Sequence, residues 1–116
     1  MSLILYGSNF CHYSKSAENL LEKFNCNKLM DNKNIMTMIN NKNDIFKNYN
    51  ILNYEYFKNY KTLPMIFFKK DNDILFLGGF DNLNLFINEI NKNKNNIIFK
   101  KSNIVVDFIN YIIKFL

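Results

Sequence analysis

Cys11 is the residue best placed for chemistry in this 116-residue chain, because it stands between a predicted strand and a predicted helix. Free N–H groups and the positive end of the helix dipole stabilise a thiolate at such a position, and thiolates are the nucleophiles of disulfide exchange. A dithiol motif would have its second cysteine three residues later, where this chain has Ser14. The residues alone leave open a one-thiol redox centre, a metal ligand and a small inert buried cysteine.

Cys26 and His12 are the other side chains with reactive potential. Cys26 falls near the end of the predicted first helix and matches no motif, so it is interpreted as a small apolar residue rather than a second redox thiol. His12 is the only histidine, and a single exposed histidine at a helix start more often neither binds a metal nor transfers a proton. Two cysteines in a chain without a predicted signal peptide also argue against a disulfide framework.

Apolar periodicity predicts the elements that position these residues. The run at residues 3–6 indicates a strand buried on both faces, and spacing of three and four residues beyond Cys11 indicates an amphipathic helix. The predicted elements are, in chain order, strand 3–6, helix 12–25, a weaker strand 27–31, one or two helices within 32–59, strands 65–69 and 74–77, a helix capped by Asp81 or Asn82, and a helix from about 104 to 115.

Composition indicates a single globular domain. The chain is 48% hydrophobic with twelve phenylalanines, which is enough to fill a modest core. The net charge of +5 permits an anionic partner, but the lysines are scattered and arginine is absent, so nucleic-acid binding is not expected. No apolar run approaches the length of a membrane span and no signal peptide is predicted, so we expect no membrane association and a cytoplasmic location.

Three segments taken together resemble the glutaredoxin branch of the thioredoxin fold. They are YGSNFCHYS at 6–14, TLP at 62–64 and GGFD at 78–81, and the resemblance covers about residues 2 to 92. It implies an α/β fold with a central mixed four-stranded sheet flanked by helices, formed by residues 1–92. Residues 93–116 are a C-terminal extension that we expect to add an extra helix, packed on the domain or at a subunit interface.

The resemblance implies a monothiol glutaredoxin, a glutathione-dependent thiol–disulfide oxidoreductase that reduces protein–glutathione mixed disulfides. The catalytic residues would be Cys11 and Ser14, with Ser14 donating its hydroxyl to the thiolate or helping to cap the helix. The expected partners are glutathione, as co-substrate, and glutathionylated proteins. The family has a cation three residues before its cysteine, where this chain has Ser8, so we expect either reduced activity or support of the thiolate by Lys15 or another lysine.

The resemblance also implies how glutathione would bind. The Leu63–Pro64 bond is expected to be cis, with the Leu63 backbone pairing with the cysteinyl part of the ligand. Asp81 would face the γ-glutamyl ammonium while helix N–H groups face its carboxylate, and Lys61, with Lys58 in reserve, would meet a carboxylate. The full set of expected glutathione-binding residues is Tyr13, Lys61, Thr62, Leu63, Pro64, Gly79, Phe80, Asp81 and Asn82.

Two other functions remain open from the sequence. Two subunits could hold a [2Fe–2S] cluster through their Cys11 thiolates and two glutathiones, which would make a homodimer and Cys11 a metal ligand. Family members that carry a cluster more often show Cys-Gly-Phe-Ser and a short insertion ahead of it, and this chain has neither. The chain could also be a non-catalytic thioredoxin-fold subunit that binds a partner through its C-terminal helix.

Overall fold

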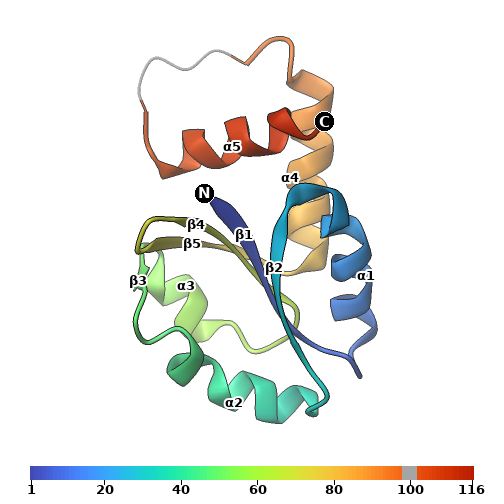
Figure 1. The fold of residues 1–116 in the computed structure, drawn as a ribbon, viewed down its shortest axis with the longest axis vertical. Helices are drawn as coiled ribbons and strands as arrows, with labels where there is room; N and C mark the ends of the chain where they lie inside the picture. The colour runs from blue at the N-terminus through green and yellow to red at the C-terminus, as the bar shows by residue number, and fades with distance from the viewer. Residues whose placement is uncertain (98–101) are drawn as a thin grey trace.

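A five-stranded mixed sheet is the framework of the molecule (Figure 1). The computed structural model describes residues 1–97 and 102–116. The spatial order of the strands is β2-β1-β4-β5-β3; β1 is parallel to β2, β5 is parallel to β3, and β4 is antiparallel to both of its neighbours. The strands are β1 (Ser2–Ser8), β2 (Cys26–Asp31), β3 (Asn50–Ile51), β4 (Met65–Lys70) and β5 (Asp73–Gly78).

The fifth strand corrects the expectation of a four-stranded sheet. Asn50 and Ile51 pair with Asp73 and Ile74 to form β3 at one edge. The Asn50 side chain also donates a hydrogen bond to the Asp73 carboxylate across 2.9 Å. Two residues are too few to produce an alternating pattern, and the apolar residues on either side have helical spacing. The prediction of one or two helices in this region therefore becomes two helices with a short strand between them.

Helices cover both faces of the sheet (Figure 1). Leu3 and Leu5 of β1 face one core with α1, α4 and α5, and Ile4 and Tyr6 face a second core with α2 and α3. This alternation explains the continuous apolar run of β1, since both of its faces are buried. The helices are α1 (His12–Leu21), which continues as a 3-10 turn (Glu22–Phe24), α2 (Ile35–Ile45), α3 (Tyr54–Asn59), α4 (Phe80–Asn93) and α5 (Ile104–Lys114).

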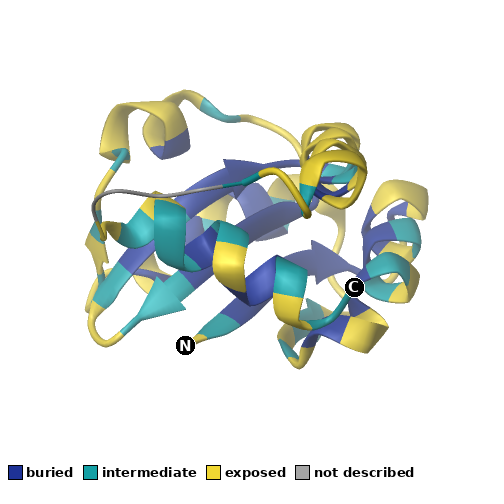
Figure 2. Cartoon of the chain, turned by 90° about the horizontal axis from the view of Figure 1, so that it is seen from above, coloured by how far each residue is buried: buried dark blue, intermediate teal, exposed yellow. Residues whose placement is uncertain are grey.

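Helix α5 packs on the same core as α1 and α4. Its residues Phe108, Tyr111 and Ile112 are buried there, and the Tyr111 hydroxyl donates to the Phe24 carbonyl across 2.6 Å. An ion pair between Lys70 and Asp107 also joins α5 to β4. The C-terminal extension therefore contributes to the core of the described chain (Figure 2, where buried residues are dark blue).

Two local predictions are wrong. Helix α4 has Gly79 as its N-cap, so Asp81 and Asn82 lie in its first turn and do not cap it. Cys26 is the first residue of β2 rather than a residue near the end of a helix, because α1 ends at Leu21 and a left-handed residue, Asn25 (φ 47°), turns the chain into the strand. No helix within the described ranges is long and apolar enough to cross a membrane.

Candidate functional site

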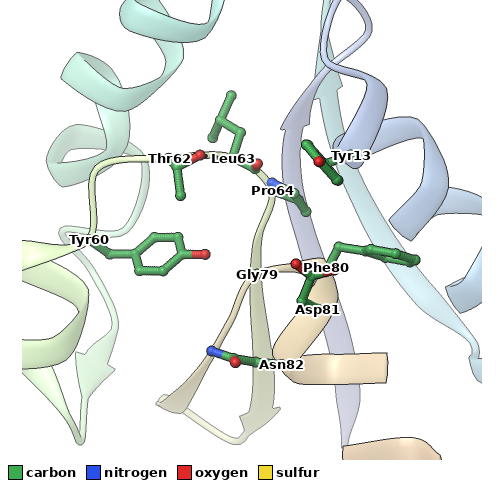
Figure 3. A pocket seen from close by; sticks show the side chains of 9 residues that line it. All are labelled: Tyr13, Tyr60, Thr62, Leu63, Pro64, Gly79, Phe80, Asp81 and Asn82. Carbon is green, nitrogen blue, oxygen red and sulfur yellow. Dashed lines mark hydrogen bonds between the residues drawn. The ribbon is translucent and has the colours of Figure 1, made fainter. Parts of the chain in front are cut away.

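A cavity of about 340 Å³ lies where α1, the segment before β4 and the start of α4 meet (Figure 3). All the predicted glutathione-binding residues line it except Lys61, which is exposed and outside the lining. The sequence analysis did not assign Tyr60 to the site, although the structure places it in the wall. The complete lining is Tyr13, Tyr60, Thr62, Leu63, Pro64, Gly79, Phe80, Asp81 and Asn82.

Cys11 lies at the N-cap of α1, next to this cavity. Its carbonyl accepts a hydrogen bond from the Lys15 amide across 3.1 Å, which begins the helix. The residue is 6% exposed, and its Sγ lies 3.8 Å from the Leu63 carbonyl oxygen. Because Leu63 and Tyr13 are lining residues, the thiol is adjacent to the cavity although Cys11 does not line it.

Ser14 contacts the turn that precedes Cys11. It is fully buried, and its Oγ accepts a hydrogen bond from the Ser8 amide across 3.3 Å. A Cβ on Gly7 would lie only 2.6 Å from that Oγ, so strand β1 needs a glycine beside Ser14. Among the hydrogen bonds of residues 1–97 and 102–116, none joins Ser14 to Cys11. Ser14 therefore supports the turn, and its action on the thiolate stays a prediction.

Ser8, at the position where the resemblance would place a cation, has a structural role. It is fully buried, its Oγ donates to the Lys33 carbonyl, and that Oγ accepts a hydrogen bond from the Phe10 amide across 3.1 Å. The Cys11 amide in turn donates to the Ser8 carbonyl across 3.0 Å. These bonds fix the turn that delivers Cys11 to the helix start.

Lys42 of α2 holds the segment that forms one wall of the cavity. It is 3% exposed, and its Nζ donates to the carbonyls of Phe57 (2.6 Å), Lys58 (3.2 Å) and Tyr60 (2.8 Å). Burial lowers the pKa of Lys42, and the charge of Lys61 lowers it further. Without Lys42 these carbonyls at the end of α3 would lack this donor. After α3 the chain continues to the Leu63–Pro64 peptide bond. This bond is cis, as the resemblance implied.

The paired glycines bring the start of α4 close to α3. Gly78 has a φ of 92°, a backbone conformation that favours glycine, and a Cβ there would lie 2.5 Å from the Tyr56 hydroxyl. A Cβ on Gly79 would collide with the Tyr60 hydroxyl. Because Gly79 offers no side-chain acceptor, the first N–H groups of α4 stay open to a ligand, with the Asp81 carboxylate beside them.

Tyr60 and Lys42 left weak signals in the sequence. Tyr60 directly precedes Lys61 and the TLP segment, but its spacing also fits the apolar face of the preceding helix. Lys42 follows Met38 at a spacing of four residues, which puts it on the buried face of α2. That spacing is the one signal that could have identified it as a buried lysine.

The chain was compared with protein-family models, with curated proteins and with solved structures. None of them matches it. Its function is therefore inferred from the site itself.

A single chain offers one cysteine at this site toward an iron–sulfur cluster, so the expected dimer with two glutathiones stays a prediction. Within the described residues, no group of three or more His, Cys, Asp and Glu side chains is placed to hold a metal ion. Cys11 supplies a single thiolate at this site, and Cys26 lies on β2 with its Sγ 3.7 Å from the Asn27 carbonyl. Clusters of this type take four protein or external ligands, so three would have to come from outside the chain.

Proposed function

We propose that this chain is a monothiol oxidoreductase of the glutaredoxin type, with a thioredoxin-like fold, that uses glutathione to reduce protein–glutathione mixed disulfides. One observation carries the proposal: the Cys11 thiol lies beside a cavity whose walls come from three segments far apart in sequence. These are the segments that carry the resemblance. Strand order β2-β1-β4-β5, with β1 parallel to β2 and antiparallel to β4, supports the fold part of the proposal.

The cavity suits the chemistry of glutathione. Its volume of about 340 Å³ lies in the range of small-molecule sites. The ligand has a thiol, which must reach Cys11, and a γ-glutamyl end with an ammonium and a carboxylate. Asp81 can pair with the ammonium, and the open N–H groups at the start of α4 can bind the carboxylate. Leu63 and Pro64, between these two points, would contact the cysteinyl part.

The reaction proceeds by two thiol–disulfide exchanges. The Cys11 thiolate attacks the glutathione sulfur of the mixed disulfide; a Cys11–glutathione disulfide forms, the original disulfide breaks, and the protein substrate leaves as a thiolate that takes up a proton. A second glutathione, as its thiolate, attacks the glutathione sulfur held on Cys11. Oxidised glutathione leaves and Cys11 returns as a thiolate, so the sulfur of the second glutathione is oxidised as the sulfur of the protein substrate is reduced to a thiol.

The position of Ser14 favours the one-thiol route. A second cysteine there could attack the Cys11 mixed disulfide from within the chain, whereas Ser14 is fully buried and bound to the Ser8 amide. The resolving thiol must therefore come from solution. Glutathione bound at the cavity places its sulfur beside Cys11, which directs the attack to the correct sulfur atom.

Turnover of a glutathionylated peptide tests the proposal. With glutathione present, the wild-type chain should release the peptide thiol and form oxidised glutathione, and Cys11→Ser should reduce this rate to the uncatalysed level. Cys26→Ser is the matched control, because Cys26 lies on β2 outside the cavity lining, and it should keep wild-type activity. Equal rates for Cys11→Ser and the wild type would contradict the proposal.

A further inference from the structure

Tyr60 places a phenol in the wall of the cavity at the start of α4. Its hydroxyl packs directly against Gly79, the N-cap of that helix, at a point where a Cβ would collide with it (Figure 3). Tyr60 lines the cavity together with Asp81. The phenol therefore borders the same part of the cavity as the open N–H groups of α4 and the Asp81 carboxylate.

The ring is held in place while its hydroxyl remains available. Its edge-to-face contacts are with Tyr56, at a centroid distance of 5.8 Å, and with Phe76, at 5.0 Å. Its carbonyl accepts a hydrogen bond from Lys42 across 2.8 Å. Within the described part of the chain, the hydrogen bonds include none to the Tyr60 hydroxyl. A fixed ring with an available O–H is a preorganised donor.

Burial and the neighbouring side chains favour the neutral form of the Tyr60 phenol. Burial raises the pKa of Tyr60, and Tyr56 and Asp81 raise it further. A neutral phenol donates a hydrogen bond, and its preferred acceptor here is an anionic oxygen, since a hydrogen bond to a charged group is the stronger kind.

Asp81 identifies which carboxylate of the ligand would bind there. A ligand end that bears only a carboxylate would be repelled by the Asp81 side chain in the same cavity. The γ-glutamyl end bears an ammonium beside its carboxylate, so Asp81 can neutralise the first while α4 and Tyr60 bind the second. The glycyl end has no cation and does not fit this environment.

We propose that Tyr60 donates its phenolic proton to the α-carboxylate of the γ-glutamyl residue of glutathione, and that it thereby selects thiols with an amino-acid head group. This inference rests on the proposed function of the same cavity. It adds a side-chain donor to a carboxylate site that otherwise consists of backbone N–H groups, and it assigns a role to a residue outside the segments that resemble the family.

Calorimetric titration of the reduced chain with reduced glutathione tests the inference. Tyr60→Phe removes the hydroxyl alone and should raise the Kd about tenfold or more, since the lost hydrogen bond is to a charged group. Tyr54→Phe is the matched control, because Tyr54 is an exposed residue of α3, the helix that ends just before Tyr60, and lies outside this cavity. Its Kd should equal that of the wild type.

A second ligand separates a direct contact from a general effect of the substitution. 4-Aminobutyryl-cysteinyl-glycine keeps the amine, thiol and glycyl carboxylate of glutathione but lacks the α-carboxylate. It should bind the wild type and Tyr60→Phe with equal Kd. If the wild type binds glutathione and Tyr60→Phe binds it as tightly, or if Tyr60→Phe weakens both ligands alike, the role of Tyr60 is overturned while the proposed function stands. If the wild type binds no glutathione, both are overturned.

Discussion

Replacing Lys42 by methionine should destabilise the fold through the wall of the cavity. The substitution keeps an unbranched side chain of similar length but removes the ammonium that donates to the carbonyls of Phe57, Lys58 and Tyr60. It also removes a cation whose Nζ lies 4.6 Å from the centre of the Phe57 ring. The acceptors remain after the substitution, so their hydrogen bonds are lost without being replaced.

The size of the effect follows from how deeply each carbonyl is buried. The bond from Lys42 to the Phe57 carbonyl is buried, and losing a hydrogen bond to a charged donor there costs about 1.5–3 kcal/mol, although the Tyr60 amide still donates to the same oxygen across 3.2 Å. The bonds to Lys58 and Tyr60 are partly buried, so water can replace the donor there, and we assign them about 1 kcal/mol together. Methionine also removes the cost of burying a charge, which offsets part of the lost stability. We expect the free energy of unfolding to fall by about 2–3 kcal/mol.

Chemical denaturation of the wild type and Lys42→Met measures this change. Lys47→Met is the matched control, because Lys47 is an exposed lysine just beyond the same helix, and it should stay within about 0.5 kcal/mol of the wild type. Lys42→Met should also bind glutathione more weakly, since the segment from Tyr60 to Pro64 loses its anchor. A change for Lys42→Met as small as that of the control would refute the reasoning.

Three further predictions concern other parts of the chain. Gly79→Ala should lower the free energy of unfolding by about 1–3 kcal/mol because the new Cβ meets the Tyr60 hydroxyl. Adding Tyr60→Phe should restore much of the lost stability, since the atoms next nearest to that Cβ lie 3.5 Å away. A double variant no more stable than Gly79→Ala would contradict this explanation. Burial raises the pKa of Cys26 to about 11. The Cys26 thiol therefore loses its proton above about pH 8.5 in the unfolded chain, whereas it keeps that proton in the folded chain. The free energy of unfolding should therefore fall as the pH rises toward 11, and Cys26→Ala should make that fall shallower in denaturation curves recorded from pH 8 to 11. Tyr111→Phe should cost about 1 kcal/mol by the same measurement, because its hydroxyl joins α5 to the Phe24 carbonyl, and an unchanged midpoint would count against that contact.

The sequence predicted the long strands and helices, because the burial of their faces sets a regular spacing of apolar residues. The run at residues 3–6 gave β1, and the spacing beyond Cys11 gave α1, since in both cases local pattern and tertiary burial agree. Strand β3 could not be predicted, because two residues pair with β5 only once the fold has brought them together. The cap of α4 was misplaced because aspartate is a common capping residue, whereas the helix has its N-cap two residues before Asp81, at Gly79.

The candidate site divides in the same way between local and tertiary causes. Backbone geometry places Cys11, Leu63 and Gly79, which lie at a helix start, at a carbonyl beside the thiol and at a close approach to Tyr60. Such geometry needs particular residue types at fixed positions, so short segments were enough to predict it. Lys42 and Tyr60 act through side chains that reach the site from other elements, and no local pattern reports where those elements pack.

The proposed redox chemistry and the proposed ligand recognition depend on different residues of the site. The proposed exchange chemistry depends on Cys11 at a helix start, which no other residue of the site could replace. The proposed recognition of glutathione depends on the cavity walls, where the Tyr60 hydroxyl and the Asp81 carboxylate would bind the γ-glutamyl end, away from the thiol. A substitution at Tyr60 should therefore change the Kd of glutathione and leave the attack of Cys11 on a bound disulfide intact, whereas a substitution at Cys11 should do the reverse. Under the proposed function, ligand choice and redox chemistry should therefore vary independently, with the Leu63–Pro64 segment lying between the residues responsible for each.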